Sequence, residues 1–413
     1  MARRKALFIS GSVGLGHAMR DLAIAKYIRN KNPEIEISWL AGLPGSTFLK
    51  EAGEILHQEN ALYANDTAIA ERSANRNFHL NLVKYLFYAI RGWKQNVKIF
   101  ERVTYNEAFD IIIADEAYEL VAALMENSEM RDRIDASFVM IYDFVGNFAM
   151  GWNPLERLGI YLWNRKWAQA VDFFADKRNI ALFVGEPEDV PDARPRGLGS
   201  QTCREVAEKM CHFTGYVLKF DPSEYLNKVM IRERLGYGEE PLIVCSIGGT
   251  SVGKDLLSLC AKAYPIMKEQ IPDLHMVLVC GPRLSPESLE VPKGLEVRGY
   301  LPALYEHFAA CDLSIIQAGG TSTLELTALR RPFLYFPLEG HWEQQIHVAG
   351  RLARHNAGIP MQYSQTTPEI LAESAVKNMG KEVAYSSINA DGAEQAAMLI
   401  NQMLSDFRGN PSQ

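Results

Sequence analysis

Short apolar runs alternate with longer amphipathic segments along the whole chain. The alternation begins at 7–10 and starts again at 241–247, after a polar stretch. Strands separated by helices are typical of βαβ units around a parallel sheet. The sequence therefore predicts an α/β protein with two Rossmann-like, doubly wound parallel-sheet domains that face each other across a cleft. The expected strands are 7–10, 35–40, 110–115, 137–142, 241–247, 275–280, 295–298, 313–317 and 332–336, and the expected helices include 17–30, 252–270 and 392–407.

Chain length and the polar stretch set the expected domain boundaries. A chain of 413 residues is too long for a single core. The segment 219–240 is rich in charge and contains Pro and Gly, which is typical of a hinge. We therefore expect an N-terminal domain at 1–218, a hinge at 219–240 and a C-terminal domain at 241–413.

Composition narrows the class of protein. Apolar residues make up 47% of the chain and charged residues 23%, which is ordinary for a globular protein. The net charge of −7 argues against a nucleic-acid binder, because there is no basic excess to neutralise phosphates. The six cysteines lack ligand-like spacing, and neither a signal-peptide pattern nor an apolar run of membrane length is present. We expect a cytoplasmic protein.

The stretch after the apolar run 313–317 carries the strongest chemical pattern. Gly319 and Gly320 let the backbone turn, and the Thr and Ser that follow supply hydroxyl and N–H groups where the next helix begins. The amino end of a helix favours an anion. Glu325, expected in the first turn of that helix, suits the two hydroxyls of a ribose. Such a site is expected to bind a nucleotide diphosphate.

With the Glu-Gln-Gln run that comes later, this stretch resembles the donor-binding segment of GT-B glycosyltransferases, both the MurG type and the UDP-glycosyltransferases. The resemblance implies phosphate contacts from the turn, a ribose contact from Glu325 and sugar contacts from the Gln pair. It also implies that the last helix packs back on the N-terminal domain. Gln317 departs from the pattern, because many relatives have His there and so gain a charged phosphate contact. The donor-binding residues so assigned are Gly319, Gly320, Thr321, Ser322, Glu325, His341, Glu343, Gln344 and Gln345.

A second loop, directly after the expected strand 241–247, again places glycines and a hydroxyl before a helix. It resembles the G-G-S/T loop of the MurG type, which implies contact with the diphosphate from the other side. Tyr300 and Leu301 match the place where relatives hold the base through backbone groups, and this favours a UDP-sugar. His341 either lines the sugar pocket or packs in the core. The residues assigned to the second loop are Gly248, Gly249 and Thr250.

No cofactor is expected. The sequence has no D-x-D triplet at the end of a strand and no His/Cys cluster with ligand spacing. The helix dipole and the hydroxyls would then stabilise the diphosphate leaving group without a metal. The family precedent is inversion at the anomeric carbon.

The loop after the first expected strand supplies a candidate base. Gly14, Gly16 and His17 match the G-x-G-x-G-H loop of the same family, in which many relatives use the His to deprotonate the acceptor hydroxyl. At the start of a helix the dipole opposes imidazolium formation and tends to keep His neutral. An acidic partner usually orients such a base. Asp115, at the end of a central strand, is our candidate, and the adjacent Glu116 stays open as an alternative.

Two further residues are assigned to the acceptor side. Asp143 ends the next strand and either adds a third carboxylate to the site or caps a helix. Arg20 shares a helix face with His17 and either contacts an acceptor phosphate or is a solvated surface charge.

The same loop also has the G-x-x-G-x-G pattern of dinucleotide-binding folds. A NAD site needs an acidic residue at the end of the second strand, and 37–42 has no carboxylate. An oxidoreductase is therefore excluded.

A basic amphipathic helix is predicted at 82–102. Apolar residues fall on one side and five Lys or Arg residues on the other, and the stretch 152–167 also mixes Trp, Tyr and Leu with basic residues. Such helices can lie on an anionic membrane surface. The alternative is a core-packed helix with a solvated basic face. A peripheral position on the inner face of the membrane thus stays a hypothesis.

Taken with the resemblance, these patterns predict a UDP-sugar-dependent hexosyltransferase with His17 as base and Asp115 as its orienting partner. The acceptor would bear a hydroxyl and, by analogy with the MurG type, would be linked to a lipid. Two alternatives stay open. One is a nucleotide-sugar hydrolase or 2-epimerase on the same fold, and the other is a UDP-binding subunit without activity.

Overall fold

The computed structural model describes residues 3–11, 13–75 and 77–406, which form two compact units. Unit 1 takes its residues from Met1–Ile69, Val83–Lys219 and Asn389–Gln413, and unit 2 takes its residues from Ala70–Leu82 and Phe220–Ile388. The chain therefore passes between the units four times and not once.

Unit 1 is built on a seven-stranded, all-parallel sheet in the order β3-β2-β1-β6-β7-β8-β9. Its central strands consist of buried residues throughout, as expected of a parallel sheet whose two faces are both covered. The strands are β1 (Lys5–Ser10), β2 (Glu36–Ala41), β3 (Ile55–Leu56), β6 (Ile111–Asp115), β7 (Ser137–Tyr142), β8 (Asn179–Phe183) and β9 (Cys211–Phe213).

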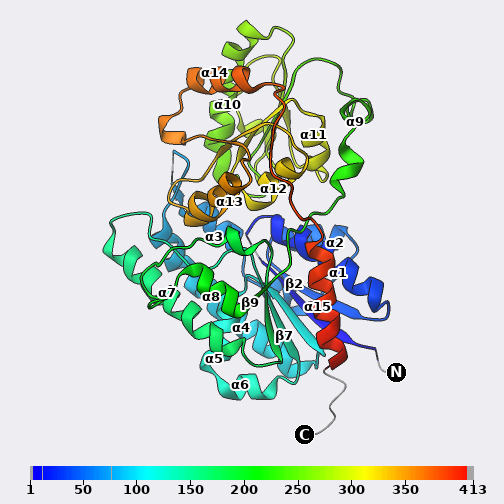
Figure 1. Cartoon of the computed structure of the whole chain (residues 1–413), viewed down its shortest axis with the longest axis vertical. Helices are drawn as coiled ribbons and strands as arrows, with labels where there is room; N and C mark the ends of the chain where they lie inside the picture. The colour runs from blue at the N-terminus through cyan, green and yellow to red at the C-terminus, as the bar shows by residue number, and fades with distance from the viewer. Residues whose placement is uncertain (1–2, 12, 76, 407–413) are drawn as a thin grey trace. The chain divides into compact units, whose positions relative to one another are not determined.

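Helices α1 (Gly16–Lys31) and α15 (Gly392–Asp406) lie side by side in unit 1 (Figure 1). Ile28 of α1 and Ile400 of α15 belong to one buried cluster with Trp39 of the sheet. The last helix is thus part of the core of unit 1, although it comes at the end of the chain. The other helices of this unit are α2 (Gly45–Glu51), α4 (Leu82–Asn106), α5 (Tyr118–Glu126), α6 (Ser128–Arg133), α7 (Pro154–Phe173) and α8 (Cys203–Met210), with the short η1 (Gln58–Leu62) and η2 (Pro187–Asp189).

Unit 2 contains a six-stranded, all-parallel sheet in the order β12-β11-β10-β13-β14-β15. The strands are β10 (Leu242–Ser246), β11 (His275–Val279), β12 (Glu296–Arg298), β13 (Leu313–Gln317), β14 (Phe333–Phe336) and β15 (Ile359–Pro360). Its helices are α9 (Lys228–Leu235), α10 (Lys254–Gln270), α11 (Leu304–Ala310), α12 (Gly320–Ala328), α13 (Ala349–Arg354) and α14 (Pro368–Asn378), with the short η3 (Pro222–Tyr225), η4 (Ser251–Gly253), η5 (Pro286–Ser288), η6 (Glu343–Val348) and η7 (Tyr363–Gln365).

Each sheet reverses its strand order once, beside its first strand. In unit 1 the chain goes from β1 to β2 on one side and returns to β6 on the other, and in unit 2 β10 is flanked by β11 and β13 in the same way. At such a switch point the connections leave in opposite directions, and ligands of open α/β sheets bind beside the carboxyl ends of the strands there. The predicted fold class, two doubly wound parallel sheets, is confirmed.

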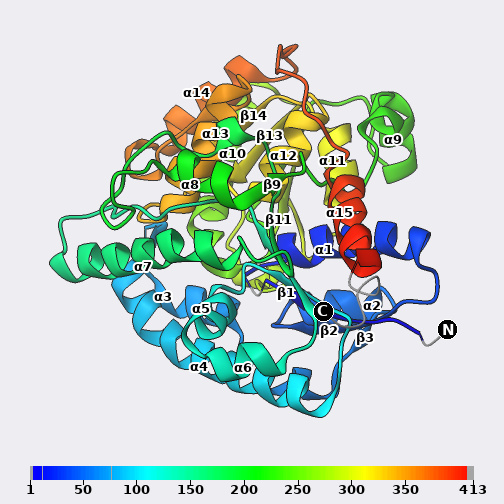
Figure 2. The same ribbon diagram turned by 60° about the horizontal axis from the view of Figure 1, so that its bottom comes forward.

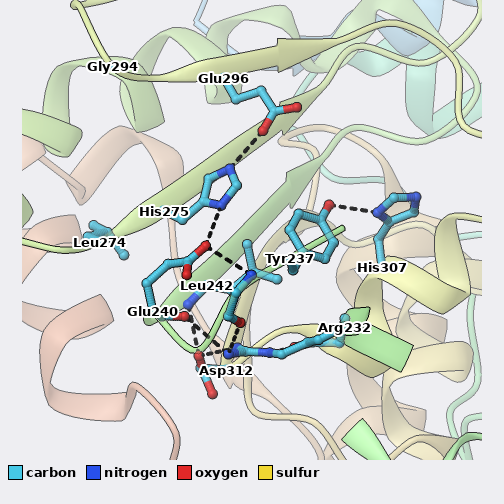
Figure 3. A network of polar contacts seen from close by, with 12 residues as sticks. Arg232, Tyr237, Glu240, Leu242, Leu274, His275, Gly294, Glu296, His307 and Asp312 are labelled. Carbon is cyan, nitrogen blue, oxygen red and sulfur yellow. Dashed lines mark hydrogen bonds and ion pairs between the residues drawn. The ribbon is translucent and has the colours of Figure 1, made fainter. Parts of the chain in front are cut away.

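The predicted hinge at 219–240 is not an open linker. It folds onto unit 2 as η3 and α9, and the Arg232 guanidinium is buried, 2.7 Å from Asp312 and 2.8 Å from the Ala310 carbonyl that its Nε donates to (Figure 3). Tyr237, at the end of the segment, bonds to His307 through its hydroxyl (2.7 Å). Part of the charge of this segment is thus buried in an ion pair, and the role of the segment as a hinge stays a prediction.

The segment Ala70–Leu82 belongs to unit 2, although it lies within the range 1–218 that was expected to form the N-terminal domain. It contains the end of α3 (Asp66–Ser73) and a hairpin of β4 (Ala74–Asn75) and β5 (His79–Leu80). Phe78 within it is fully buried among core residues of unit 2. We call this segment the arm.

Helices α4 and α7 are neighbours in unit 1 (Figure 2), where Trp93 and Trp163 meet edge to face at 5.1 Å between ring centroids. The predicted apolar side of α4 is buried or half-buried, as core packing requires. The exposed side, however, carries apolar as well as basic residues, with Phe87 76% exposed. None of the described helices is both long and apolar enough to cross a membrane.

Candidate functional site

The acceptor-side candidates gather where β1 and β6 end side by side. β1 ends at Ser10, the glycine loop follows, and α1 begins at Gly16, so His17 lies in the first turn of this helix. Asp115 is the last residue of β6. His17 Nδ1 lies 3.0 Å from Asp115 Oδ2, and the carboxylate is fully buried. The structure thus brings the predicted base and its predicted partner together.

Arg20 joins the same group one helical turn later. Its Nη2 lies 2.5 Å from Asp115 Oδ1 and its Nη1 lies 2.9 Å from Asp143 Oδ2. The side chain is only 11% exposed. The alternative of a solvated surface charge is therefore wrong, whereas the contact to an acceptor phosphate stays a prediction. Arg20 is the buried counter-ion of two carboxylates.

The carboxylates shift the pKa of His17 in the direction opposite to the one expected from the helix dipole. Burial lowers its pKa, but the charge of Asp115 and the hydrogen bond to it, helped by Asp143, outweigh burial and leave the pKa raised above 6.5. Burial likewise opposes ionisation of Asp115, and Arg20 and His17 more than compensate, so the pKa of Asp115 is lowered. The helix dipole, on which the sequence expectation of a neutral His rested, is the weaker influence here because charged groups lie in direct contact.

Two more carboxyl groups belong to this cluster. Glu116 has a left-handed backbone (φ 49°), and its Oε2 lies 3.7 Å from His17 Nε2, the ring nitrogen that faces away from Asp115. Non-glycine residues in this conformation are strained and concentrate at functional sites. Asp21 is fully buried, accepts the Ser10 hydroxyl (2.5 Å), and has a pKa raised well above its usual range by burial and by Asp115. The sequence analysis weighed Glu116 but missed Asp21, which no local pattern marks.

The glycine loop after β1 is hydrogen-bonded to a residue 53 positions later in the chain. The Gly14 N–H donates to Thr67 Oγ1 (2.9 Å), so this amide is engaged within unit 1. Gly16 is the first residue of α1. The loop therefore positions His17 through its turn geometry.

The donor-side candidates gather at the switch point of unit 2, where β13 ends and α12 begins. Gly319 precedes the helix with an extended backbone, and the first intrahelical bond runs from Thr323 N–H to the Gly319 carbonyl (3.2 Å). The N–H groups of Gly320, Thr321 and Ser322 therefore point beyond the end of the helix. Their direction and the helix dipole suit an anion.

Glu325 differs from its expected position. The helix begins at Gly320, so Glu325 is its sixth residue and lies in the second turn. It is only 4% exposed. Its negative charge contributes to raising the pKa of Tyr305 on α11, where burial is the largest cause. A ribose contact would thus come from a buried carboxylate and not from one on the surface of unit 2.

The sequence analysis missed Arg351 on α13. Its Nη2 donates to the Gly320 carbonyl (2.9 Å) and lies 3.4 Å from Thr323 Oγ1. The guanidinium therefore lies beside the first turn of α12. A cation is disfavoured at the positive end of a helix dipole unless an anion accompanies it. No local sequence pattern marks this arginine, because the contact depends on how α13 packs against α12.

The loops after β10 and β11 are in backbone contact. Gly281 has a φ of +72°, and a Cβ at this position would collide with the Gly248 carbonyl oxygen. Gly249 and Thr250 follow on the β10 loop, and Thr250 caps η4 with an extended backbone. Tyr300 and Leu301, both half-buried, lie between β12 and α11.

The Glu-Gln-Gln run lies on a π-helix, η6. Such helices are rare and occur frequently at functional sites. Gln344 Oε1 accepts the Leu338 N–H (2.8 Å), and Gln345 Nε2 donates to the Leu338 carbonyl (3.1 Å). Each glutamine thus uses one end of its amide on the same backbone residue. Burial lowers the pKa of His341, just before this helix, to about 4. His341 Nε2 lies 3.8 Å from Glu343 Oε2.

The predicted site residues thus form two groups, one in each unit, at the carboxyl ends of parallel strands. In unit 1, Arg20 contacts His17, Asp115 and Asp143, and His17 also contacts Asp115. In unit 2 the candidates lie on the loops after β10, β12, β13 and β14. Within the part of the chain that the structure describes, no three His, Cys, Asp or Glu side chains are arranged to hold a metal ion.

Comparison with known proteins shows a match between part of unit 2 and a family model, together with similar proteins of known or assigned class. Residues 243–403 match the glycosyltransferase family 28 C-terminal domain. An uncharacterized glycosyltransferase of Methanopyrus kandleri is 24% identical over 190 residues, which are 46% of this chain and 53% of that protein. The aligned region thus spans about half of that relative.

Two further similarities extend over nearly the whole chain. The UDP-N-acetylglucosamine–N-acetylmuramyl-(pentapeptide) pyrophosphoryl-undecaprenol N-acetylglucosamine transferase of Acetivibrio thermocellus is 22% identical over 435 aligned positions, covering 98% of both chains. The crystal structure of the glycosyltransferase SnogD from Streptomyces nogalater superposes with a TM-score of 0.54 at 15% identity, covering 98% of this chain and 96% of that one. The structural similarity shows a common fold.

Proposed function

We propose that this protein transfers a sugar from a UDP-sugar to an acceptor hydroxyl. The match of residues 243–403 to the glycosyltransferase family 28 C-terminal domain and the GT-B fold of the chain support this proposal. One observation carries the proposal. The N–H groups at the start of α12 point outward at the switch point of unit 2, with the Arg351 guanidinium beside them. This is the chemistry that a diphosphate requires.

Arg351 would supply the positive charge that Gln317 lacks compared with the His of many relatives. Glu325 would hold the ribose. The backbone of Leu338 orients the side-chain amides of the two glutamines. The Gln344 oxygen accepts the Leu338 N–H, and the Gln345 nitrogen donates to the Leu338 carbonyl. Gln344 would therefore donate a hydrogen bond to the sugar, and Gln345 would accept one.

On the acceptor side, His17 would act as the general base. Arg20 Nη2 also lies 2.8 Å from Nδ1, and arginine only donates, so the base role requires the tautomer in which Nδ1 carries the proton and donates to Asp115. In that tautomer Nε2 has a lone pair that can take the proton of the acceptor hydroxyl. The acceptor oxygen then bonds to the anomeric carbon while the bond from that carbon to the UDP oxygen breaks. UDP leaves with the electron pair, and the proton stays on His17. Displacement from the opposite side would invert the anomeric configuration.

The test of the donor site is nucleotide binding. We expect UDP to raise the melting temperature, because a ligand at about 100 times its Kd adds about 2.7 kcal/mol to the stability of the native state. Glu325→Gln should weaken UDP binding by about 10- to 100-fold in calorimetry, since a hydrogen bond from a charged group is worth about 1.5–3 kcal/mol. If UDP, TDP and GDP all leave the wild-type melting temperature unchanged, the proposed function is wrong.

Assays of turnover would separate the alternative enzymes. Steady UDP release from a UDP-sugar without any acceptor would indicate a hydrolase or a 2-epimerase. UDP binding without turnover over a broad panel of acceptors would indicate a subunit that only binds the nucleotide.

We further propose that α4 and α7 lie on an anionic membrane surface, where a lipid-linked acceptor would be presented. Phe87 on α4 is 76% exposed and Trp152, just before α7, is 86% exposed. Exposed Arg91, Lys94 and Lys98 on α4 supply charge complementary to acidic lipids. At a bilayer interface such apolar side chains are removed from water while the neighbouring basic side chains pair with acidic headgroups.

Flotation with vesicles tests this contact. At low salt the protein should float with vesicles that contain phosphatidylserine. It should remain in the bottom fraction when the vesicles contain only phosphatidylcholine. The double variant Phe87→Ser, Trp152→Ser should lose most of this binding. Ile55→Ser, which removes an equally exposed apolar side chain on β3, should retain it. Absence of wild-type binding at low salt would end the membrane proposal.

A further inference from the structure

The arm, Ala70–Leu82, connects the loops that carry the donor-side candidates. It comes from the N-terminal sequence but belongs to unit 2, where it contacts residues that come 177 (Phe78 to Asp255) to 285 (Phe78 to Tyr363) positions later. Asp255, in the first turn of α10, accepts the N–H groups of Asn77 (2.8 Å) and Phe78 (3.1 Å). The Phe78 ring stacks on Tyr363 with 5.2 Å between centroids. The arm is therefore anchored in the core and is not a loosely attached loop.

One end of the arm contacts the loops after β10 and β11 through Glu71. Its Oε1 accepts the Ser251 N–H (3.0 Å), and Arg283 donates to both of its oxygens, from Nε (3.2 Å) and from Nη2 (2.7 Å). The Glu71 side chain is 15% exposed. Ser251 directly follows the Gly-Gly-Thr loop assigned to the diphosphate. Glu71 thus ties this loop to Arg283 by charge-assisted bonds at both ends.

The other end of the arm contacts the loop that leads into η6. Leu80 N–H donates to the Glu339 carbonyl (2.8 Å), and Glu339 N–H donates to the Phe78 carbonyl (3.1 Å). Gly340 follows with a φ of +76°, and a Cβ there would collide with the Leu80 carbonyl oxygen. The arm thereby adds a short strand to this loop. His341 and the sugar-side glutamines begin immediately after it.

We infer that the arm is a positioning element of the donor site, and that Glu71 is the residue through which it holds the diphosphate loop. The inference rests on the proposed function. The loops after β10 and β11 already contact each other through Gly248 and Gly281, and the arm contacts both of them as well as the loop after β14. The arm bonds to each of them through a few backbone groups and one carboxylate. Its position sets how the diphosphate loop and the sugar-side residues lie relative to each other within unit 2.

Glu71→Gln is the sharpest test, because glutamine keeps the shape and the acceptor for Ser251 but loses the charge that holds Arg283. We expect the Kd for UDP to rise about five- to tenfold, since loss of a charge-assisted bond loosens the loop that must meet the diphosphate. The melting temperature should change little, because Phe78 and Asp255 still anchor the arm. Glu373→Gln, at an exposed glutamate of α14, is the matched control and should leave both quantities unchanged.

A double-mutant cycle identifies the partner. If Glu71 acts through Arg283, the variant Glu71→Gln, Arg283→Gln should bind UDP no more weakly than the weaker of the two single variants. Additive losses would mean that the two residues act separately, and would overturn the role assigned to the pair. An unchanged UDP Kd in Glu71→Gln, with or without a lower melting temperature, would show that the contact is merely structural.

Hydrogen exchange on the wild type gives a test that does not depend on a variant folding. Addition of UDP should slow exchange at the arm amides of Phe78 and Leu80 together with those of the diphosphate loop. Protection of the loop without the arm would overturn the inference while leaving the proposed function intact. If wild-type protein binds no nucleotide diphosphate at all, the proposed function fails first.

Discussion

His17→Ala is expected to lower kcat by about 10²- to 10⁴-fold while the Kd for UDP changes little. General-base assistance by a well-placed His is worth about this much. His17 lies in unit 1, hydrogen-bonded to the buried Asp115, whereas the nucleotide candidates lie in unit 2. Its loss should therefore affect the proton transfer and leave the diphosphate contacts in place. Steady-state kinetics with calorimetry on the same preparation would measure both quantities.

The pH profile supplies an independent check on His17. A base must be neutral to accept a proton, and the carboxylates around His17 raise its pKa above 6.5. Wild-type kcat should therefore rise with pH through neutrality and level off above the raised pKa. Asp115→Asn removes the largest raising influence, so the rise should move to lower pH while the maximum falls. Full turnover in His17→Ala, or a flat wild-type profile from pH 6 to 9, would contradict the base assignment.

Arg20→Met is expected to lower the free energy of unfolding by about 3–5 kcal/mol, the range seen when one partner of a buried ion pair is removed. The guanidinium contacts Asp115 and Asp143 at the same time. Methionine fills a similar volume but leaves both buried carboxylates without the guanidinium that pairs with them. Chemical denaturation of the two proteins at pH 7 would measure the difference.

A matched arginine in the same unit serves as control for this variant. Arg102 pairs with Glu59 at 3.0 Å, and its side chain is 51% exposed. Arg102→Met should therefore lose no more than about 1 kcal/mol, as is usual for exposed ion pairs. If Arg20→Met is no less stable than Arg102→Met, the buried cluster does not contribute to folding as its geometry suggests. At lower pH the loss in Arg20→Met should shrink, because protonation of the carboxylates removes their repulsion.

Much of the fold was predictable because its signals are local. Buried parallel strands appear as short apolar runs, and the expected strand 137–142 coincides with β7 and 313–317 with β13. The positions of His17 and Asp115 at the ends of neighbouring strands follow from the same pattern, because carboxyl ends of parallel strands share one edge. The two glycine turns that precede helices were recognisable for the same reason.

The sequence was less informative where a residue's surroundings depend on distant partners. The charge in 219–240 predicted a hinge, but it did not indicate that Arg232 is buried against Asp312, eighty residues later. Arg20 was expected to face a phosphate or water, and it pairs with two carboxylates that come from other strands. A one-dimensional pattern reports which residues are charged, but it does not report which opposite charges the fold brings to them.

By itself the sequence determined the two parallel sheets, and it predicted a candidate base and a candidate anion site at the ends of their strands. Only the tertiary structure decided the direction in which the pKa of His17 is shifted, the placement of Arg351 beside α12, and the crossing of the arm into unit 2. The physical reason is a difference in range. Strands and turns follow from periodicity over a few residues, whereas ion pairs, pKa shifts and segment exchange follow from contacts between residues that the chain separates by tens to hundreds of positions.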